Sequence, residues 1–353
     1  MVECESPSDD SAAVARFQEL LADSLAGEAI CRRSGANLVC TFQLPGKRKS
    51  GQIMALGHAD TVWPSGTLQS MPFRQQAGRL HGPGVLDMKA GLAFFMFATR
   101  ALRELEIAVA RRVILQVNSD EETGSRTSRA LTEKNARASA AVLVLEPGTG
   151  LEGKLKTARK GIGDYRIKVR GVASHAGVDF EKGASAVLEL ANQLRRIAEF
   201  TDLQRGITVN PGVISGGSRS NVIAAEAEAL VDIRIPRLRD AAPLDRKFRS
   251  LRPLDRRCSI EVTGGLNRPP MERSDGVRKL FTLARKLAKE LGIDLEESAT
   301  GGGSDGNFTA ALGIPTLDGL GGVGEGAHAV HESILISRIP DRVALIAKLL
   351  AAI

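Results

Sequence analysis

The sequence predicts an α/β fold into which a smaller α+β unit is inserted. Short, largely apolar runs at residues 51–57, 112–118 and 141–145 indicate buried strands of one sheet. Helical stretches lie between them, an alternation typical of α/β proteins. From about Gly161 the pattern changes to alternating strands that share their segment with only two helical stretches. We therefore expect an inserted unit in which two helices cover a four-stranded sheet.

Each element of the larger unit follows from a local pattern. Apolar residues at helical spacing follow a Ser-Asp-Asp-Ser cap region near the N-terminus, and the segment from Lys89 is apolar on nearly all sides. A basic turn at residues 46–50 separates the first two strands. In chain order we expect a helix at 12–25, strands at 38–42 and 51–57, a helix at 89–105, a strand at 112–118, a helix at 127–137 and a strand at 141–145.

The second half of the chain contains the inserted unit and the return to the larger one. A glycine-rich run at residues 300–307 lacks the G-K-[ST] ending of a phosphate loop, so we do not expect nucleotide binding there. Its glycines instead let the backbone approach a substrate closely. The expected elements are strands at 164–169, 207–214, 228–235 and 258–262, helices at 184–200, 244–251, 275–291 and 340–353, and a strand-like segment at 314–317.

Length and composition indicate an ordinary soluble protein. With 353 residues and 43% hydrophobic content, the chain can form two domains with substantial cores. It has no apolar run of about 18 residues and no signal core at its acidic N-terminus, so we expect a cytoplasmic protein without membrane association. No C-x-x-C spacing occurs, so we expect four reduced thiols, at Cys4, Cys31, Cys40 and Cys258.

The net charge of +7 raises the question of a nucleic-acid partner. Aromatic residues make up only 4% of the chain, and no basic run has stacking residues interleaved. The arginine-rich segment 237–257 also contains Asp240, Asp245 and Asp255, which is typical of an ion-paired, solvated helix face. We therefore expect no nucleic-acid binding, and an anionic small substrate fits the charge at least as well.

Acidic and histidine residues follow three of the predicted strands. His58 and Asp60 come after the first, Glu121 and Glu122 after the second, and Glu146 after the third. A solvated turn or a satisfied histidine explains any one of these alone. Three of them at one edge of a sheet are better explained by a shared site. Asp60 lies two residues beyond His58, on the same face, where it can accept a hydrogen bond from the ring.

Together with two more distant residues, these side chains make a plausible metal-binding set. Two imidazoles and three carboxylates form a mixed nitrogen and oxygen set, which suits zinc or cobalt better than calcium. An aspartate that bridges two ions, with one histidine and one carboxylate on each, gives two matched sites. Either glutamate of the adjacent pair could be the ligand on these grounds. The set consists of His58, Asp87, Glu122, Glu146 and His328.

The sequence resembles a dizinc metallopeptidase family that includes glutamate carboxypeptidases, acetylornithine deacetylases, succinyl-diaminopimelate desuccinylases and aminoacylases. The matching stretches run in family order from Gly57 to about Glu332 and cover nearly the whole chain. They are G-H-A-D-T-V-W-P, R-L-H-G-P-G-V-L-D-M-K-A-G, S-D-E-E-T-G-S, L-E-P-G, V-A-S-H-A-G and G-G-G-S-D-G-N-F. The glutamate carboxypeptidases are the most similar branch.

The resemblance implies a domain arrangement and a cofactor. Residues 1–160 and 269–353 would form a mixed-sheet zinc-exopeptidase catalytic domain, and residues 161–268 an inserted dimerisation or lid domain. The family pattern also implies a homodimer with two Zn²⁺ per subunit, or Co²⁺ or Mn²⁺ in their place.

The resemblance also assigns roles to individual residues. His58 and His328 would each bind one metal, Asp87 would bridge both, and Glu122 and Glu146 would complete opposite sites. Glu121 would be the general base that takes a proton from metal-activated water, and Asp60 would orient the first histidine. His175, in A-S-H-A-G, would reach the partner subunit's active site and stabilise the oxyanion.

Three departures from the family pattern matter. His81 stands where a tyrosine is expected, and His331 where an acidic residue usually follows the ligand histidine. We choose His328 as the last ligand because it keeps the family's spacing to Glu332. The chain also begins close to E-S-P-S, so its first helix is expected to be shortened.

The implied activity is metal-dependent removal of a C-terminal amino acid, glutamate by the nearest branch, from N-acyl or peptidyl substrates. The alternative is an N-acyl amino acid deacylase such as acetylornithine deacetylase or a desuccinylase. An arginine can bind a substrate carboxylate through two parallel hydrogen bonds. Arg234 and Arg268 could each instead be surface charges. On the family's pattern the substrate-binding residues are Arg234, Asn221, Arg268, Lys154 and Gly303.

Overall fold

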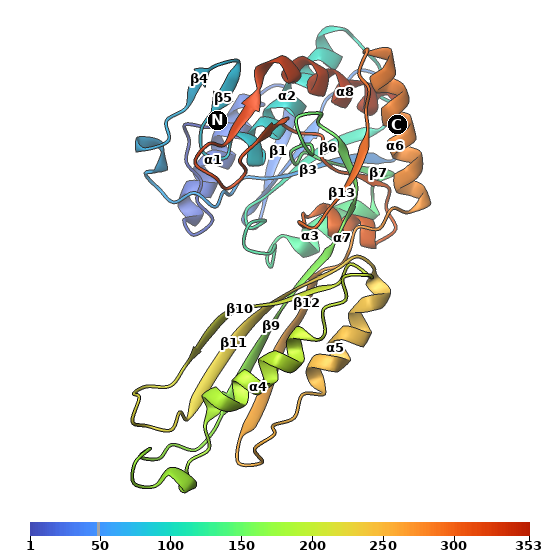
Figure 1. Cartoon of the computed structure of the whole chain (residues 1–353). Helices are drawn as coiled ribbons and strands as arrows, with labels where there is room; N and C mark the ends of the chain where they lie inside the picture. Colours follow the sequence, from blue (N-terminus) through green and yellow to red (C-terminus); the bar gives the residue numbers. More distant parts are fainter. Residues whose placement is uncertain (48–49) are drawn as a thin grey trace. The chain divides into compact units, whose positions relative to one another are not determined.

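A computed structural model describes residues 1–47 and 50–353 of the chain (Figure 1). The middle of the expected basic turn at residues 46–50 lies outside these ranges. The described residues separate into two compact units. The large unit comprises Met1–Arg159, Met271–Thr300 and Ser304–Ile353, and the inserted unit comprises Lys160–Pro270 with Gly301–Gly303.

The large unit is built on a mixed six-stranded sheet with the order β1-β2-β6-β3-β7-β14. Strands β6, β3, β7 and β14 run parallel, whereas β1 and β2 are antiparallel to their neighbours. The prediction of an α/β fold with a mixed sheet is confirmed. The strands are β1 (Ala29–Ser34), β2 (Asn37–Phe42), β3 (Gln52–His58), β6 (Arg112–Asn118), β7 (Ala141–Val144) and β14 (Thr316–Leu317).

Helices cover both faces of this sheet, which explains its continuous apolar strands. Ile53 and Ala55 of β3 face a core shared with α1, α2, α6 and α8, while Met54 and Leu56 face a smaller core shared with α3. The helices are α1 (Ser11–Ser24), α2 (Ala90–Glu104), α3 (Arg129–Arg137), α6 (Asp275–Glu290), α7 (Gly306–Ala311) and α8 (Ile339–Ala352). Short helical turns are η1 (Thr67–Gln69), η2 (Val85–Lys89) and η5 (Ile336–Arg338).

Two small sheets in the large unit brace the loops around the main one. β16 (Ser333–Leu335) pairs with β5 (Arg79–His81), which joins the segment after His328 to the segment before Asp87. The other members are β4 (Arg74–Gln76), β15 (Gly324–Glu325) and, in a separate parallel pair, β8 (Leu155–Arg159) with β13 (Glu297–Thr300).

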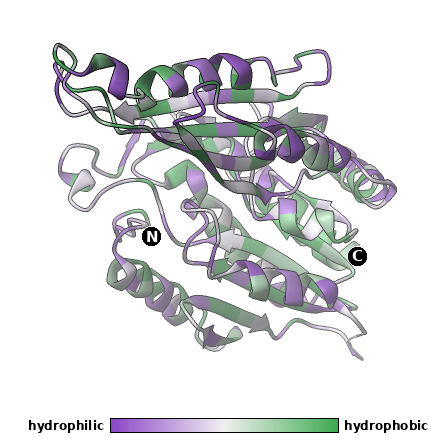
Figure 2. Ribbon diagram, turned by 90° about the horizontal axis from the view of Figure 1, so that it is seen from below, coloured by the Kyte–Doolittle hydropathy of each residue, from purple (hydrophilic) through white to green (hydrophobic). Residues whose placement is uncertain are grey.

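The inserted unit is an antiparallel sheet of order β10-β11-β9-β12 with two helices on one face. Burial alternates along β9, and the covered face packs on the helices, with Tyr165 stacked on Phe248 of α5 at 3.8 Å. Figure 2 shows that its helices carry both hydrophilic and hydrophobic residues, as amphipathic helices do. Its elements are β9 (Gly161–Arg170), η3 (Phe180–Lys182), α4 (Ala186–Ala198), β10 (Thr208–Gly216), β11 (Glu226–Ile235), η4 (Leu238–Asp240), α5 (Ala241–Arg249) and β12 (Ser259–Arg268).

The expectation of four reduced thiols is wrong for one pair. Cys31 and Cys40 lie directly opposite each other on β1 and β2 and form a disulfide. Their sequence spacing fits no known motif, and only the register of the hairpin brings them together. Cys4 and Cys258 are free. Among the described residues, no helix is long and apolar enough to cross a membrane.

Candidate metal centre

The carboxyl ends of three adjacent parallel strands carry the predicted acidic and histidine residues. His58 is the last residue of β3, and it pairs with Asn118, the last residue of β6. The loop after β6 carries Glu121, and Glu146 follows β7 on the other side of β3. The side chains are largely buried, with exposed fractions of 2% for His58, 9% for Glu121 and 7% for Glu146. The sheet therefore brings them to one edge, as expected for α/β proteins.

Asp87 reaches the same edge from the helical turn η2, which leads into α2. Glu332 holds this turn in place. Its carboxylate accepts hydrogen bonds from the main-chain N–H groups of Gly84 at 2.9 Å, Leu86 at 2.8 Å and Asp87 at 3.0 Å. It also accepts one from Nε1 of Trp63 at 2.8 Å. Glu332 lies four residues after His328, so it ties the loop of one expected ligand to the loop of another.

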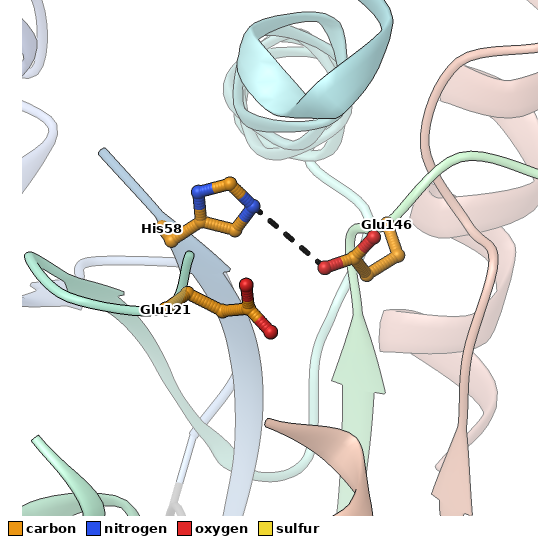
Figure 3. Close-up of side chains that lie close together, drawn as sticks. All are labelled: His58, Glu121 and Glu146. Atoms are coloured by element: carbon orange, nitrogen blue, oxygen red, sulfur yellow. Dashed lines mark ion pairs between the residues drawn. The ribbon is translucent and has the colours of Figure 1, made fainter. Parts of the chain in front are cut away.

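The five predicted ligand side chains form two half-sites around the carboxylate of Asp87. Its Oδ1 lies 3.2 Å from Nε2 of His58, and its Oδ2 lies 3.3 Å from Nε2 of His328. Glu146 Oε1 is 3.7 Å from His58 Nε2 (Figure 3), and Glu122 Oε1 is 3.4 Å from His328 Nε2. We call these groups the His58 half-site (His58, Asp87, Glu146) and the His328 half-site (His328, Asp87, Glu122).

The chemistry of the two half-sites fits divalent cations. Oε1 of Glu122 is buried and its nearest positive group is Nε2 of His328 at 3.4 Å, a contact that a cation between the two would replace. Burial, followed by the negative charge of Asp87, raises the pKa of Glu146 to about 7. A dication would favour the charged form of this carboxyl. Each half-site would supply one imidazole nitrogen and two carboxylates, a set that binds transition-metal dications well.

The pKa values of the two histidines are both raised, but by different contacts. Hydrogen bonds with Asp87 and then Glu122 raise the pKa of His328 to about 10. Burial opposes protonation of His58, but its contacts with Asp60 and Asp87 outweigh burial and raise its pKa well above the ordinary value. A metal ligand must be a neutral imidazole, so metal binding at either half-site would displace a proton.

Asp60 has a different set of contacts from the one expected. Nδ1 of His58 bonds to the main-chain oxygen of Asp60 at 2.8 Å, whereas the nearest carboxylate oxygen is 3.5 Å away. The carboxylate accepts hydrogen bonds from the N–H groups of Glu121 at 3.2 Å and Glu122 at 3.1 Å, and from Oγ of Ser8 at 2.9 Å. Asp60 therefore fixes the backbone of the glutamate pair as well as standing beside the ring. Nothing in the sequence pattern pointed to Ser8.

Glu121 lies beside the His58 half-site. Its carboxylate, the ring of His58 and the carboxylate of Glu146 each offer an atom within 4.8 Å of the others (Figure 3). His58, Asp87 and Glu122 likewise each offer an atom within 4.8 Å of the others. Glu121 is therefore close enough to exchange a proton with a molecule bound at the half-site.

The structure also separates the histidines that the sequence left ambiguous. His328 has a left-handed backbone with φ of 62° and points its Nε2 at Asp87. His331 is exposed, three residues further along. His81 is part of β5, where it pairs with Ser333.

The predicted substrate-binding residues fall into separate groups. Lys154, in the large unit, forms an ion pair with Glu296 at 2.5 Å. In the inserted unit, Arg234 and Arg268 both pair with Ile162 at the start of β9. A side chain at Gly303 would collide with that isoleucine and press on Arg268. The guanidinium of Arg234 is held by Asp232 at 2.9 Å.

His175 and Asn221 lie together at the opposite end of the inserted sheet. Ala176, next to His175, donates its N–H to the main-chain oxygen of Asn221 at 3.0 Å. Nδ1 of His175 accepts a hydrogen bond from the N–H of Gly177 at 3.1 Å, so Nε2 carries the proton of the neutral ring. Strand β9 separates this end from Ile162 by roughly 27 Å, at about 3.4 Å per residue.

Comparison with known proteins identifies the family of this chain. The profile of Peptidase family M20/M25/M40 matches residues 54–352. The chain belongs to this family. Carboxypeptidase G2 from Pseudomonas sp. (strain RS-16) is 30% identical over 359 residues, covering 99% of this chain and 86% of that protein. Acetylornithine deacetylase from Klebsiella pneumoniae (strain 342) is 29% identical over 200 residues, which cover 52% of this chain and 50% of that protein.

Solved structures of the family share the fold. Aminopeptidase PepT from Bacillus cereus ATCC 10987 matches with a TM-score of 0.78 and 21% identity, covering 99% of this chain and 95% of that one. The Bacillus subtilis YXEP protein, described as a dinuclear metal-binding peptidase, matches with a TM-score of 0.73 and 12% identity, covering 99% and 94%. The resemblance drawn from the sequence is thus confirmed, and this member of the family is a metallopeptidase or amidohydrolase.

Proposed function

We propose that this M20 family member is a dizinc hydrolase that removes a C-terminal amino acid, glutamate in the first instance, from N-acyl or peptidyl substrates. The observation that carries the proposal is the carboxylate of Asp87 between two imidazoles, with Glu121 beside one of them. The relative named carboxypeptidase G2 aligns over nearly its whole length, whereas the deacetylase aligns over half of its own. This difference supports a carboxypeptidase over the alternative, an N-acyl amino acid deacylase or desuccinylase.

The side chains around the half-sites would divide the work of hydrolysis. Bound divalent ions would polarise the scissile carbonyl and make water a better nucleophile. Glu121 would accept a proton from the attacking water and then deliver it to the nitrogen of the leaving amino acid. Asp60 supports this role because it holds the N–H of Glu121 and so limits where the carboxylate can lie.

Recognition of the substrate would use the inserted unit as well. The guanidinium of Arg268, whose residue is only 7% exposed, can grip the free α-carboxylate through two parallel hydrogen bonds. Gly303 leaves room beside this arginine, and Arg234 and Lys154 would add positive charge. His175 would donate its Nε2–H to the oxyanion that develops during attack.

A homodimer is part of the proposal, because His175 and Asn221 lie far from Arg268 within their own sheet. Strand β10 is an edge strand, and it exposes Val213 and Ile214 by 55% and 61%. Leu188 of the neighbouring helix α4 is 66% exposed. An edge strand with exposed apolar side chains is a ready surface for pairing with a second copy, which would let these two residues act in the partner's site.

The dimer is tested by complementation. Glu121→Gln and His175→Ala subunits are each expected to be inactive. Mixing them under conditions that allow subunit exchange should restore part of the activity, because one of the two sites in the hybrid then keeps both groups. Full activity of a monomer in solution scattering would contradict the proposal.

The activity is tested with a small panel of substrates and one variant. N-acyl glutamates, their α-amides, dipeptides and N-acetylornithine are assayed with added zinc or cobalt, with a chelated sample as the control. We expect the N-acyl glutamates to be cleaved and the α-amides to be resistant. Glu121→Gln should bind metal normally and lose about 10² to 10⁴ in rate. Preferential cleavage of N-acetylornithine would support the deacylase alternative.

We also propose a cytoplasmic location. The Cys31–Cys40 disulfide argues against it, since disulfides are rare in reducing compartments. Maleimide labelling of protein unfolded straight from cells tests this. Four labelled thiols fit the cytoplasm, and two labelled thiols fit an oxidising compartment.

A further inference from the structure

A cluster of buried charges lies behind Glu146, and the proposed mechanism does not use it. Arg159, at the end of β8, is 4% exposed, Asp318, directly after β14, is 0% exposed, and Lys156 of β8 is 8% exposed. Burying charged groups costs free energy unless each is paired and well hydrogen-bonded. A cluster of this kind therefore needs a structural or functional reason.

Asp318 fixes the orientation of the Arg159 guanidinium. Nε of Arg159 donates to Asp318 Oδ2 and Nη2 donates to Oδ1, both at 2.8 Å, which is the bidentate geometry. Oγ of Ser304 donates to the same carboxylate at 2.6 Å. The main chain of Asp318 is itself fixed, because its oxygen accepts the N–H of Lys156 at 2.8 Å. The guanidinium is thus held in one plane by a carboxylate that has little freedom to move.

The held guanidinium forms an ion pair with Glu146. Nη2 of Arg159 lies 3.8 Å from Glu146 Oε2, while the other oxygen, Oε1, lies 3.7 Å from Nε2 of His58. The backbone on either side is also restrained. Lys156 Nζ donates to the oxygen of Pro147 at 2.7 Å, and Gly321 N–H donates to the main-chain oxygen of Glu146 at 2.8 Å. The two carboxylate oxygens therefore have different neighbours, and the main chain that carries them is restrained.

We propose that Arg159, locked by Asp318, is a positioning residue that makes Glu146 a one-oxygen ligand of the metal in the His58 half-site. The inference rests on the proposed metal-dependent function. With Oε2 paired with the guanidinium, Oε1 is the oxygen that would face an ion beside His58. A carboxylate that gives one oxygen instead of two lowers the coordination number, and so leaves a position open for the reacting groups.

The competing explanation is that the Arg159 and Asp318 pair merely stabilises the fold. Arg342 provides the matched control, because it is equally buried, at 2%, and lies in the same unit. Its guanidinium donates to main-chain oxygens, including those of Gly153 at 2.9 Å and Gly321 at 3.1 Å. Replacing either arginine by lysine keeps the charge and removes the fork of donors. Only the first replacement should alter the metal site itself.

The test uses cobalt as the probe in full-length protein that carries His328→Asn, so that the His58 half-site reports alone. Four-coordinate Co²⁺ absorbs visible light much more strongly than six-coordinate Co²⁺, so the absorbance reports coordination number. Adding Arg159→Lys is expected to lower the absorbance per bound ion and to weaken cobalt affinity, measured by calorimetry, by about 10- to 100-fold. Adding Arg342→Lys should change neither quantity.

A second variant covers the case in which Arg159→Lys does not fold. Arg159→Met combined with Asp318→Asn removes both charges of the bidentate pair together, so that neither partner of that pair is left as an unpaired ion. It should show the same loss of absorbance and affinity. The proposal is overturned if cobalt spectrum and affinity are unchanged in these variants, or if Arg342→Lys changes them equally. Absence of cobalt binding by the unaltered protein would instead overturn the proposed function on which the inference rests.

Discussion

The two half-sites contain the same kinds of ligand but are built very differently. His58 and Glu146 follow adjacent strands of the parallel sheet, and both residues are less than a tenth exposed. His328 sits on a loop, its side chain is 48% exposed, and its backbone is left-handed, a conformation that costs free energy outside glycine and asparagine. The His58 half-site is therefore preorganised by the sheet, whereas the His328 half-site depends on a loop that can adjust.

If each half-site binds one ion, this difference predicts that one ion is held tightly and the other loosely, although the two sets of candidate ligands match. Asp87 is the candidate ligand common to both halves, and its two oxygens face the two histidines at nearly equal distances of 3.2 and 3.3 Å. Asymmetry must then arise from the other ligands and from the elements that carry them. Substitutions in each half can separate these contributions.

The largest effect is expected from Asp87→Asn, which acts on both halves at once. The amide keeps the shape but loses the charge shared by the two ions, so the protein should lose both. Hydrolysis should fall by ~10³-fold or more, on the order of 4 kcal/mol of transition-state stabilisation. Elemental analysis of the dialysed protein measures the metal content. Retention of one tightly bound ion would show that the carboxylate does not bridge.

The same substitution in each half-site tests the difference in preorganisation. His58→Asn should lower the free energy of unfolding of the metal-free protein by about 2 to 4 kcal/mol, because it opens a buried gap and removes a hydrogen bond. His328→Asn should lower the free energy of unfolding by less, because the side chain is half exposed, asparagine tolerates the left-handed backbone, and only the contribution of the imidazole charge is lost. Calorimetric unfolding in chelator measures both. Equal destabilisation would contradict the difference in preorganisation.

The pH dependence of the metal-free protein provides a third test. The pKa of His328 is raised from 6.5 to about 10, so its charge contributes stability that is fully present below about pH 6.5 and is lost as pH rises through 10. The melting temperature in chelator should therefore fall between pH 7 and 10, and it should fall less in His328→Asn. The difference between the two proteins is the measurement, because all other groups titrate in both. Parallel curves would show that the histidine is not charged in this range.

The sequence predicted the main sheet from local patterns, and the family resemblance supplied the candidate ligands. The apolar runs of β3, β6 and β7 mark strands buried on both faces, and their ends carry the polar residues. Strands of two or three residues, such as β14 and β15, were missed or only hinted at because a period cannot be read from so few positions. The Cys31–Cys40 pair was missed for a similar reason, since it depends on hairpin register.

The contacts that hold the ligands were not predictable, because they join distant parts of the chain. Glu332 binds the N–H of Asp87 across 245 positions, and Arg159 binds Asp318 across 159. Motif spacing places a residue in the sequence but gives no information about such partners. The same limit applied to Asp60, whose place beside His58 was foreseen while its hydrogen bonds to the glutamate pair were not.

The smallest effect, and the finest test of the comparison, is expected from Ser8→Ala. Oγ of Ser8 donates to Oδ2 of Asp60, the oxygen that also accepts the N–H of Glu122, whereas Oδ1 accepts the N–H of Glu121. Losing one hydrogen bond should cost ~1 kcal/mol, or roughly fivefold in an equilibrium constant. Because the lost donor restrains the oxygen that serves Glu122, affinity at the His328 half-site should weaken while that at the His58 half-site stays the same. Ser24→Ala is the control, since its hydroxyl donates to the oxygen of Leu20 on the exposed side of α1. Stepwise zinc titration by calorimetry resolves the two sites, and equal weakening of both would mean that Asp60 acts on the centre as a whole.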